Sequence, residues 1–222
     1  AVEDEGTSKF DEKMTSRKLV EELGFGWNLG NTFDAWNSSQ NQGLDSETCW
    51  GNPETTVDMI DALVKKGFRA IRIPVTWHNH LIDDKYTIDP AWMLRVKTVV
   101  NWCIRRGLYV ILNTHHDNCD KKDRPIKYGE GYYPLLIHAK ESAQFIYNVW
   151  AQIAKAFNNG YDQHLIFEGL NEPRMIGMTH EWWYDVNNDT CKESALVLNE
   201  FHRIIHKAIR ESGGNNEKRF IL

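Results

Sequence analysis

Apolar runs recur at near-regular intervals along the 222-residue chain, and this recurrence constrains the fold more than any other feature. The runs begin near residues 24, 68, 109, 165 and 219, and a segment with helical spacing of apolar side chains lies between each pair. Strands that alternate with helices in this way form βα units, and the strands of such units pair in parallel. We therefore predict one domain over residues 1–222, a parallel sheet covered by helices, after a loose lead-in at 1–16.

The boundaries of these elements can be estimated from caps and breakers. Strands are expected at 24–31, 68–75, 108–113 and 164–170, with a fifth beginning at 219, and a short helix at 16–23. Asn52-Pro53-Glu54 predicts a helix start, because it offers a cap, a proline at the first position and an acid in the first turn. Asp89-Pro90 predicts the start of the next helix in the same way.

Two folds contain successive βα units, the open doubly wound sheet and the (β/α)8 TIM barrel. A doubly wound dinucleotide-binding sheet carries a glycine-rich phosphate turn after its first strand, whereas this chain has Gly-Asn-Thr-Phe-Asp at 30–34. A complete barrel needs roughly 250 residues, and the chain supplies about four and a half of the eight units. We predict an α/β fold that forms the N-terminal portion of a barrel. Its open sheet edges would need the remaining half, in cis or from another chain.

Composition excludes several classes of function. The net charge of −5, without a basic run, argues against a nucleic-acid partner, and no apolar stretch approaches the ~20 residues of a membrane span. Residues 1–6 are acidic and polar, unlike a signal peptide, and fit equally a mature end left by processing. The four cysteines have neither zinc-ligand nor Cys-x-x-Cys spacing, so the redox compartment stays open. Cys103 is expected to be a buried thiol on a helix.

The fourth predicted strand ends abruptly on Asn171 and Glu172. Pro173 cannot donate to a sheet ladder, so the strand must stop there. Catalytic side chains of a barrel lie at the carboxyl ends of its strands. A polar pair closing a strand is the ordinary interpretation of Asn-Glu-Pro, but three other strand ends here also finish in polar or aromatic residues. Glu172, in a partly enclosed mouth, suits the role of a general acid.

Charged and imidazole side chains mark two further strands. Arg72 interrupts an apolar strand, and a buried guanidinium needs a carboxylate; a structural ion pair with Glu168 is one interpretation. His115 and His116 follow the third strand, where alternation predicts that only one of them points into the mouth. Asp117 shares a face with His115, so a metal hydrolase is a minor alternative.

Five short motifs lie at successive strand ends within residues 20–222. They read Gly-Trp-Asn-Leu-Gly-Asn-Thr-Phe-Asp at 26–34, Glu-Thr-Cys-Trp-Gly-Asn-Pro at 47–53, Ile-Arg-Ile-Pro-Val-Thr-Trp at 71–77, Leu-Asn-Thr-His-His-Asp at 112–117 and Phe-Glu-Gly-Leu-Asn-Glu-Pro-Arg at 167–174. Together they resemble the family 5 glycoside hydrolases, most nearly the bacterial endoglucanases and xyloglucanases. The resemblance implies a (β/α)8 barrel that hydrolyses β-1,4-glucan with retention of configuration. It also implies a secreted or cell-surface enzyme without metal or cofactor.

The resemblance assigns roles by motif position. Glu172 matches the general acid/base, and Asn171 matches the residue that bonds the sugar 2-hydroxyl. Arg72 matches the arginine that steadies the nucleophile. His115 matches the histidine lining the subsite at the cleaved bond, with His116 as its neighbour.

Three loop residues, Asn31, Trp36 and Trp50, would lie along the glycan cleft by the same resemblance. Aromatic faces stack on sugar rings, which would explain why tryptophans occur in these loops. Cellulose, mixed-linkage glucan, xyloglucan and mannan all stay open as substrates, and a non-catalytic glycan-binding half-barrel is the alternative to an enzyme.

The nucleophile of the resembled family is a glutamate at the end of the seventh strand, which these residues do not reach. Glu168 cannot replace it, because a retaining pair of carboxyl groups is ~5–5.5 Å apart. Four residues along a strand span roughly 13 Å at about 3.3 Å each. We therefore expect the nucleophile beyond Leu222, and expect the chain alone to be inactive and either insoluble or oligomeric.

Overall fold

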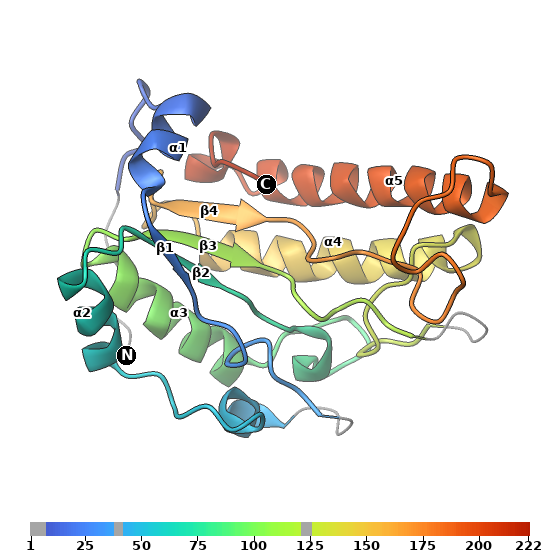
Figure 1. Ribbon diagram of the computed structural model, residues 1–222, viewed down its shortest axis with the longest axis horizontal. Helices are drawn as coiled ribbons and strands as arrows, with labels where there is room; N and C mark the ends of the chain where they lie inside the picture. Colours follow the sequence, from blue (N-terminus) through green and yellow to red (C-terminus); the bar gives the residue numbers. More distant parts are fainter. Residues whose placement is uncertain (1–7, 38–41, 121–125) are drawn as a thin grey trace.

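The fold is built on four parallel strands that follow chain order across the sheet. The computed structural model describes residues 8–37, 42–120 and 126–222, and the first seven residues of the predicted lead-in lie outside this range. The strands are β1 (Gly26–Asn28), β2 (Ala70–Ile73), β3 (Tyr109–Asn113) and β4 (Leu165–Glu168), in the order β1-β2-β3-β4 (Figure 1). A doubly wound sheet reverses its strand order at a switch point, and these strands show no reversal. The predicted βα units are confirmed.

The last residues of the chain lie beside β4. Phe167 and Ile221 form a parallel bridge, and Leu222 N donates to Phe167 O at 2.8 Å. Gly169 N donates in turn to Leu222 O at 3.0 Å. Residues 220–222 therefore occupy the position of a fifth strand, next to β4.

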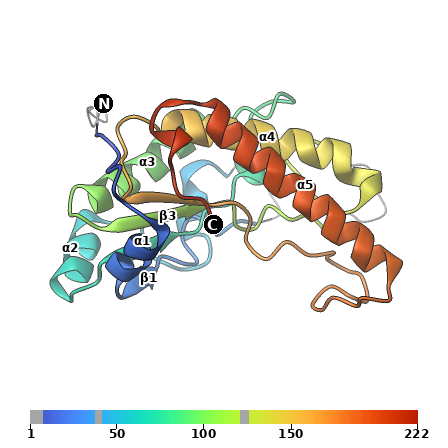
Figure 2. The same ribbon diagram turned by 90° about the horizontal axis from the view of Figure 1, so that it is seen from above.

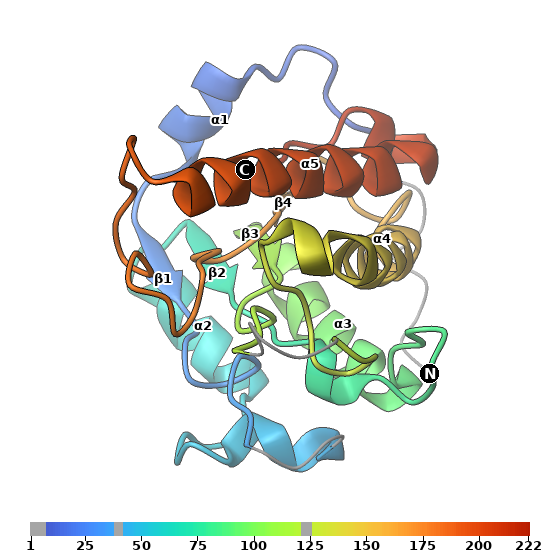
Figure 3. The ribbon, with the colours of Figure 1, turned by 90° about the vertical axis from the view of Figure 1, so that its right-hand side faces the viewer.

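The outer face of the sheet is covered by α2 (Val57–Lys65), α3 (Pro90–Ile104), α4 (Ala139–Ala156) and α5 (Asp189–Glu211). Helix α1 (Ser16–Leu23) instead packs at the amino ends of the strands, against the inner face. Figures 2 and 3 show α3, α4 and α5 on the same side of the strands, with α4 against α5. Short 3-10 turns occur at η1 (Gly43–Thr48), η2 (His78–His80), η3 (Leu136–His138) and η4 (Gly214–Glu217). None of the helices in the described ranges is long and apolar enough to cross a membrane.

The helix predicted at Asn52 begins five residues later, at Val57. The Asn52 amide does not cap a helix, because it donates to Gly30 O at 3.0 Å and to Thr32 Oγ1 at 3.3 Å. It ties the first loop to the second, and residues 52–56 run without helical structure. The predicted start of α3 is confirmed: Asp89 accepts a hydrogen bond from Ala91 N, and Pro90 is the first helical residue.

Alternation along the strands separates an apolar outer face from a layered inner face. Outward side chains such as Ile71, Leu112 and Phe167 are fully buried in the main core beneath the helices. At the amino ends of the strands the inner face is apolar, where Leu19 of α1 packs with Ala70, Tyr109 and Ile166. Towards the carboxyl ends the inner face becomes polar, with Asn28, Arg72, Asn113 and Glu168. The polar layer of Asn28, Arg72, Asn113 and Glu168 thus lies at the end of the sheet where a site is expected.

Cys103 lies on α3 as a fully buried free thiol, as predicted. Burial raises the pKa of this thiol to about 12. The thiol therefore stays protonated and acts as a small apolar side chain.

Candidate active site

Arg72 and Glu168 form the centre of the polar layer. Arg72 Nε and Nη2 each donate to a Glu168 carboxylate oxygen at 2.6 Å, a bidentate fork. Burial raises the pKa of Glu168, but hydrogen bonds from Arg72 and Asn113 outweigh it and hold the pKa below its ordinary value. The structural ion pair considered from the sequence is therefore present.

The Arg72 guanidinium also orients two neighbouring amides. Nη1 donates to Asn28 Oδ1 and Nη2 donates to Asn171 Oδ1, both at 3.0 Å. An amide oxygen held in this way directs the Asn171 amide nitrogen towards other acceptors. Asn171 N is itself fixed by Thr114 O at 3.0 Å. Arg72 thus positions Asn171 whether or not it also meets a nucleophile.

Asn113 links Glu168 to His115. Its amide nitrogen donates to Glu168 Oε1 at 2.9 Å and lies 3.0 Å from His115 Nδ1. Its amide oxygen accepts a hydrogen bond from Val75 N at 3.0 Å. Burial, followed by the neighbouring His116, lowers the pKa of His115 to about 4, so the ring is neutral near pH 7.

Both histidines approach the same carboxylate, and the prediction that only one would face the mouth is wrong. His115 Nε2 lies 3.9 Å and His116 Nε2 lies 3.7 Å from Asp34 Oδ2. The residues follow β3, which ends at Asn113, so the alternation of a regular strand no longer applies to them. Burial raises the pKa of Asp34, but the nearby His116 ring and hydrogen bonds from backbone N–H groups hold it below its ordinary value.

Asp117 does not join His115, which corrects the metal-site alternative. The Asp117 side chain is fully buried, and its Oδ1 accepts hydrogen bonds from Trp77 N at 2.8 Å and His78 N at 2.7 Å. His78 Nδ1 lies 3.2 Å from the same oxygen. The Asp117 carboxylate therefore stabilises the loop after β2 by accepting hydrogen bonds from its backbone.

Glu172 stands at the rim of this network. Its backbone has a φ of 42°, in the left-handed region that costs energy for a residue with a side chain. Its side chain is 63% exposed, and the carboxylate lies 3.3 Å from Arg174 Nη1. The carboxyl group is therefore accessible to a ligand in the mouth.

Of the predicted cleft residues, Trp50 lies at the mouth, whereas Trp36 and Asn31 contact neighbouring loop residues. Trp50 is exposed, and its ring centroid lies 5.6 Å from that of His116, which places it at the mouth. Trp50 Nε1 donates to Trp36 O at 2.8 Å, while the Trp36 ring lies edge-on to His78. Asn31 is exposed, with a φ of 58°, and its backbone helps to keep Asp34 ionised.

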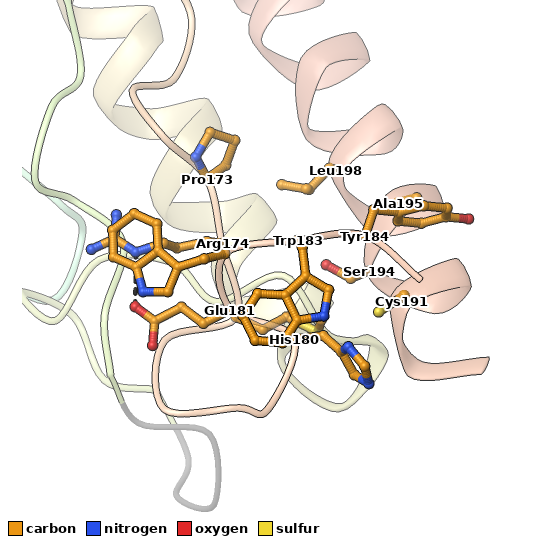
Figure 4. Close-up of a pocket in the computed structure, with 12 residues that line it drawn as sticks. Pro173, Arg174, His180, Glu181, Trp183, Tyr184, Cys191, Ser194, Ala195 and Leu198 are labelled. Carbon is orange, nitrogen blue, oxygen red and sulfur yellow. Dashed lines mark hydrogen bonds and ion pairs between the residues drawn. The ribbon is translucent and has the colours of Figure 1, made fainter. Parts of the chain in front are cut away.

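The loop after Glu172 carries polar and aromatic groups that the sequence analysis missed. Arg174 Nε donates to Glu181 Oε1 at 2.9 Å, and its guanidinium lies 4.2 Å from the Trp182 ring centroid. A cavity of about 260 Å³ lies between this loop and α5, lined by Glu181 and Trp183 from the loop and by Ser194 and Leu198 from α5 (Figure 4). The run Trp-Trp-Tyr at 182–184, exposed in a loop, was the available signal.

Comparison with known proteins identifies the family. The profile described as "Cellulase (glycosyl hydrolase family 5)" matches residues 32–222. The chain belongs to this cellulase family. Endoglucanase 1 of Ruminococcus albus is 46% identical to it over 212 residues, which is 94% of this chain and 47% of that protein.

Two solved structures of glycosyl hydrolases extend the comparison to the fold. The catalytic domain of CELCCA superposes with a TM-score of 0.86 at 42% identity, over 97% of this chain and 54% of that one. A broad-specificity endoglucanase from Ruminococcus champanellensis with bound cellotriose gives 0.84 at 37% identity, over 96% and 58%. The cellulase-family chain described here has the fold of the first part of a (β/α)8 barrel and spans about half the length of these relatives.

Proposed function

We propose that the protein carrying this chain is a retaining endo-1,4-β-glucanase in which Glu172 is the general acid/base. One observation supports this above the others. In a cellulase-family chain, an accessible carboxyl group lies at the carboxyl end of β4, directly after an asparagine that is held by Arg72. Barrel enzymes carry their chemistry at this end of the strands.

The proposed reaction has two steps. A nucleophilic carboxylate attacks the anomeric carbon, the bond to the leaving sugar oxygen breaks, and Glu172 gives its proton to that oxygen. Glu172 then takes a proton from a water molecule, whose oxygen attacks the same carbon and displaces the carboxylate. The released sugar therefore keeps its β configuration.

The other site residues receive roles from their hydrogen bonds. Asn171 has its amide nitrogen available for the sugar 2-hydroxyl because Arg72 occupies its oxygen. His115 and His116 line the sugar subsite beside Asp34, and Trp50 extends that wall with an aromatic face. The Trp36 carbonyl oxygen holds the Trp50 ring, and both Trp36 and Asn31 are proposed to lie along the glycan cleft. We propose that Arg72, which binds Glu168, also contacts the nucleophilic carboxylate and holds it in position.

The nucleophile is proposed to lie outside these 222 residues. Both oxygens of Glu168 accept hydrogen bonds from Arg72, and its side chain is only 16% exposed, so it is poorly placed to attack a sugar. The chain covers 47% of the Ruminococcus albus endoglucanase, which leaves room for a second carboxylate in the rest of the protein.

The substrate is proposed to be a β-1,4-linked glucan. The Ruminococcus champanellensis relative is solved with cellotriose, which supports a chain of glucose units as the ligand. Such polymers do not cross a cell membrane, so we also propose that the protein acts in the secreted fraction or at the cell surface.

The test is an assay of the full-length protein on carboxymethylcellulose and cello-oligosaccharides, with proton NMR of the first product. We expect hydrolysis, with the β-anomer appearing before mutarotation. Release of the α-anomer first would contradict the retaining mechanism. Binding of cello-oligosaccharides without hydrolysis would instead favour the non-catalytic glycan binder.

A further inference from the structure

The hydrogen bonds around Asn113 leave this amide only one orientation. Val75 N is a donor and needs the amide oxygen, whereas the Glu168 carboxylate is an acceptor and needs the amide nitrogen. Rotating the amide by 180° would set donor against donor and acceptor against acceptor. Asn113 is fully buried, so each lost contact would leave an unsatisfied group.

The fixed amide in turn determines the proton position on His115. One N–H of Asn113 goes to Glu168 Oε1 at 2.9 Å, and the other points to His115 Nδ1 at 3.0 Å. Nδ1 must therefore accept, and the neutral ring carries its hydrogen on Nε2. His115 Nε2 is 3.9 Å from Asp34 Oδ2, too far for a hydrogen bond, so the N–H can serve another oxygen.

We propose that Asn113 is a positioning residue that holds His115 in the Nε2–H tautomer, so that His115 donates a hydrogen bond to a hydroxyl oxygen of the bound sugar unit. This inference rests on the proposed glucanase function. Asn113 lies on β3, Val75 in the loop after β2, and Glu168 on β4. Residues from three neighbouring segments of the chain therefore determine which ring nitrogen of His115 carries the hydrogen.

The same tautomer opposes a metal ion at the histidine pair. Ligand atoms of Asp34, His115 and His116 lie within 4.8 Å of one another, as a metal site requires. A ring nitrogen that carries hydrogen has no lone pair for a metal, and moving the hydrogen to Nδ1 would oppose it to the Asn113 N–H. The cluster is therefore built to donate to an oxygen rather than to hold a cation.

The first test reads the tautomer directly in the full-length protein. Long-range proton–nitrogen NMR of ¹⁵N-histidine-labelled protein distinguishes a protonated from an unprotonated ring nitrogen, and His115→Ala assigns the signals. We expect His115 with hydrogen on Nε2 and a bare Nδ1 from pH 6 to 8. A ring with hydrogen on Nδ1, or a mixture of both tautomers, would overturn the proposal without any activity measurement.

The second test asks whether Asn113 acts through His115. Asn113→Ala should lower kcat/KM by about fivefold to tenfold, the scale of one neutral hydrogen bond, and should produce a tautomer mixture. In a His115→Ala background the same change should lower kcat/KM by no more than about twofold, because the imidazole through which Asn113 acts is already absent. An equal loss in both backgrounds means that Asn113 acts through Glu168 or through the fold, and would refute the proposed role.

The matched control is Thr114→Val, at the next residue of the same segment. It removes a buried hydroxyl that donates to Gly169 O at 2.6 Å and leaves the His115 ring contacts in place. We expect an unchanged His115 tautomer, and a shifted tautomer would count against a specific role for Asn113. If the wild-type protein hydrolyses no glucan, the proposed function fails, while the NMR result still decides the tautomer.

Discussion

Removing the Arg72 guanidinium while keeping Glu168 should destabilise the protein substantially. In Arg72→Met, Glu168 loses both short contacts of the fork, and among the residues that the structure describes it keeps only the hydrogen bond from the Asn113 amide. Breaking a buried ion pair from one side costs about 3–5 kcal/mol. The Arg72 side chain is 27% exposed and Glu168 is 16% exposed, so solvent screens the pair in part, and we expect a loss of about 2–3 kcal/mol in the free energy of unfolding at pH 7, at or below the lower limit of that range.

The loss should depend on pH in a direction fixed by Glu168. In the wild-type fold the pKa of Glu168 is below its ordinary value of 4.5, so the pair contributes its stability above that pH and loses it as the pH falls. The difference between Arg72→Met and wild type should therefore shrink below about pH 4.5. Urea unfolding followed by tryptophan fluorescence at pH 7 and pH 4 measures both values.

Companion variants separate the structural role of Arg72 from its role in catalysis. Arg72→Met with Glu168→Leu should recover stability to within about 1–2 kcal/mol of wild type, because no buried charge is left alone. Turnover of glucan should stay absent. Arg72→Lys should also fail to restore turnover, because an ammonium lacks the planar fork. Recovery of both stability and turnover in the double variant would refute the proposed catalytic role of Arg72.

Three further predictions concern buried groups. Burial lowers the pKa of His80 from 6.5 to about 3, so the unfolded chain binds a proton between pH 6.5 and 5 and the native state does not. The free energy of unfolding should therefore fall by about 2 kcal/mol over this pH range. In His80→Phe, urea unfolding should show a smaller dependence of this free energy on pH. Glu47→Gln should cost about 3 kcal/mol in the same assay, because Arg95 then loses the buried carboxylate that it contacts at 2.8 Å. In native protein, iodoacetamide should modify exposed Cys49 well before Cys103, as peptide mass spectrometry would show, and equal rates would contradict the burial of Cys103.

The order of strands and helices could be predicted from the sequence because it rests on local signals. Apolar spacing located the four strands, and the Asp89-Pro90 cap located the start of α3. The Asn52 signal was equally good locally but failed. The Asn52 amide is taken by Gly30 O and Thr32 Oγ1, two partners that a local pattern does not contain.

The site could be predicted residue by residue but not as a network. Arg72, Asn171 and Glu172 were recognisable at strand ends, and the structure brings them together. Asn113 was not recognisable, because its role depends on Glu168, 55 residues away, and on Val75 in the loop after β2. Strand alternation misassigned His115 and His116, because the regular strand ends before them.

The role of Glu172 is tested most directly by comparing leaving groups in Glu172→Gln, which keeps the side-chain shape and removes the acid. On cello-oligosaccharides, whose leaving oxygen needs a proton, kcat/KM should fall by about 10²–10⁴-fold or more. On an aryl cellobioside with an activated leaving group, the first step should lose far less. Glu200→Gln, at an exposed position on α5, is the control and should match wild type on both substrates. An equal loss on both substrates in Glu172→Gln would contradict its assignment as the general acid.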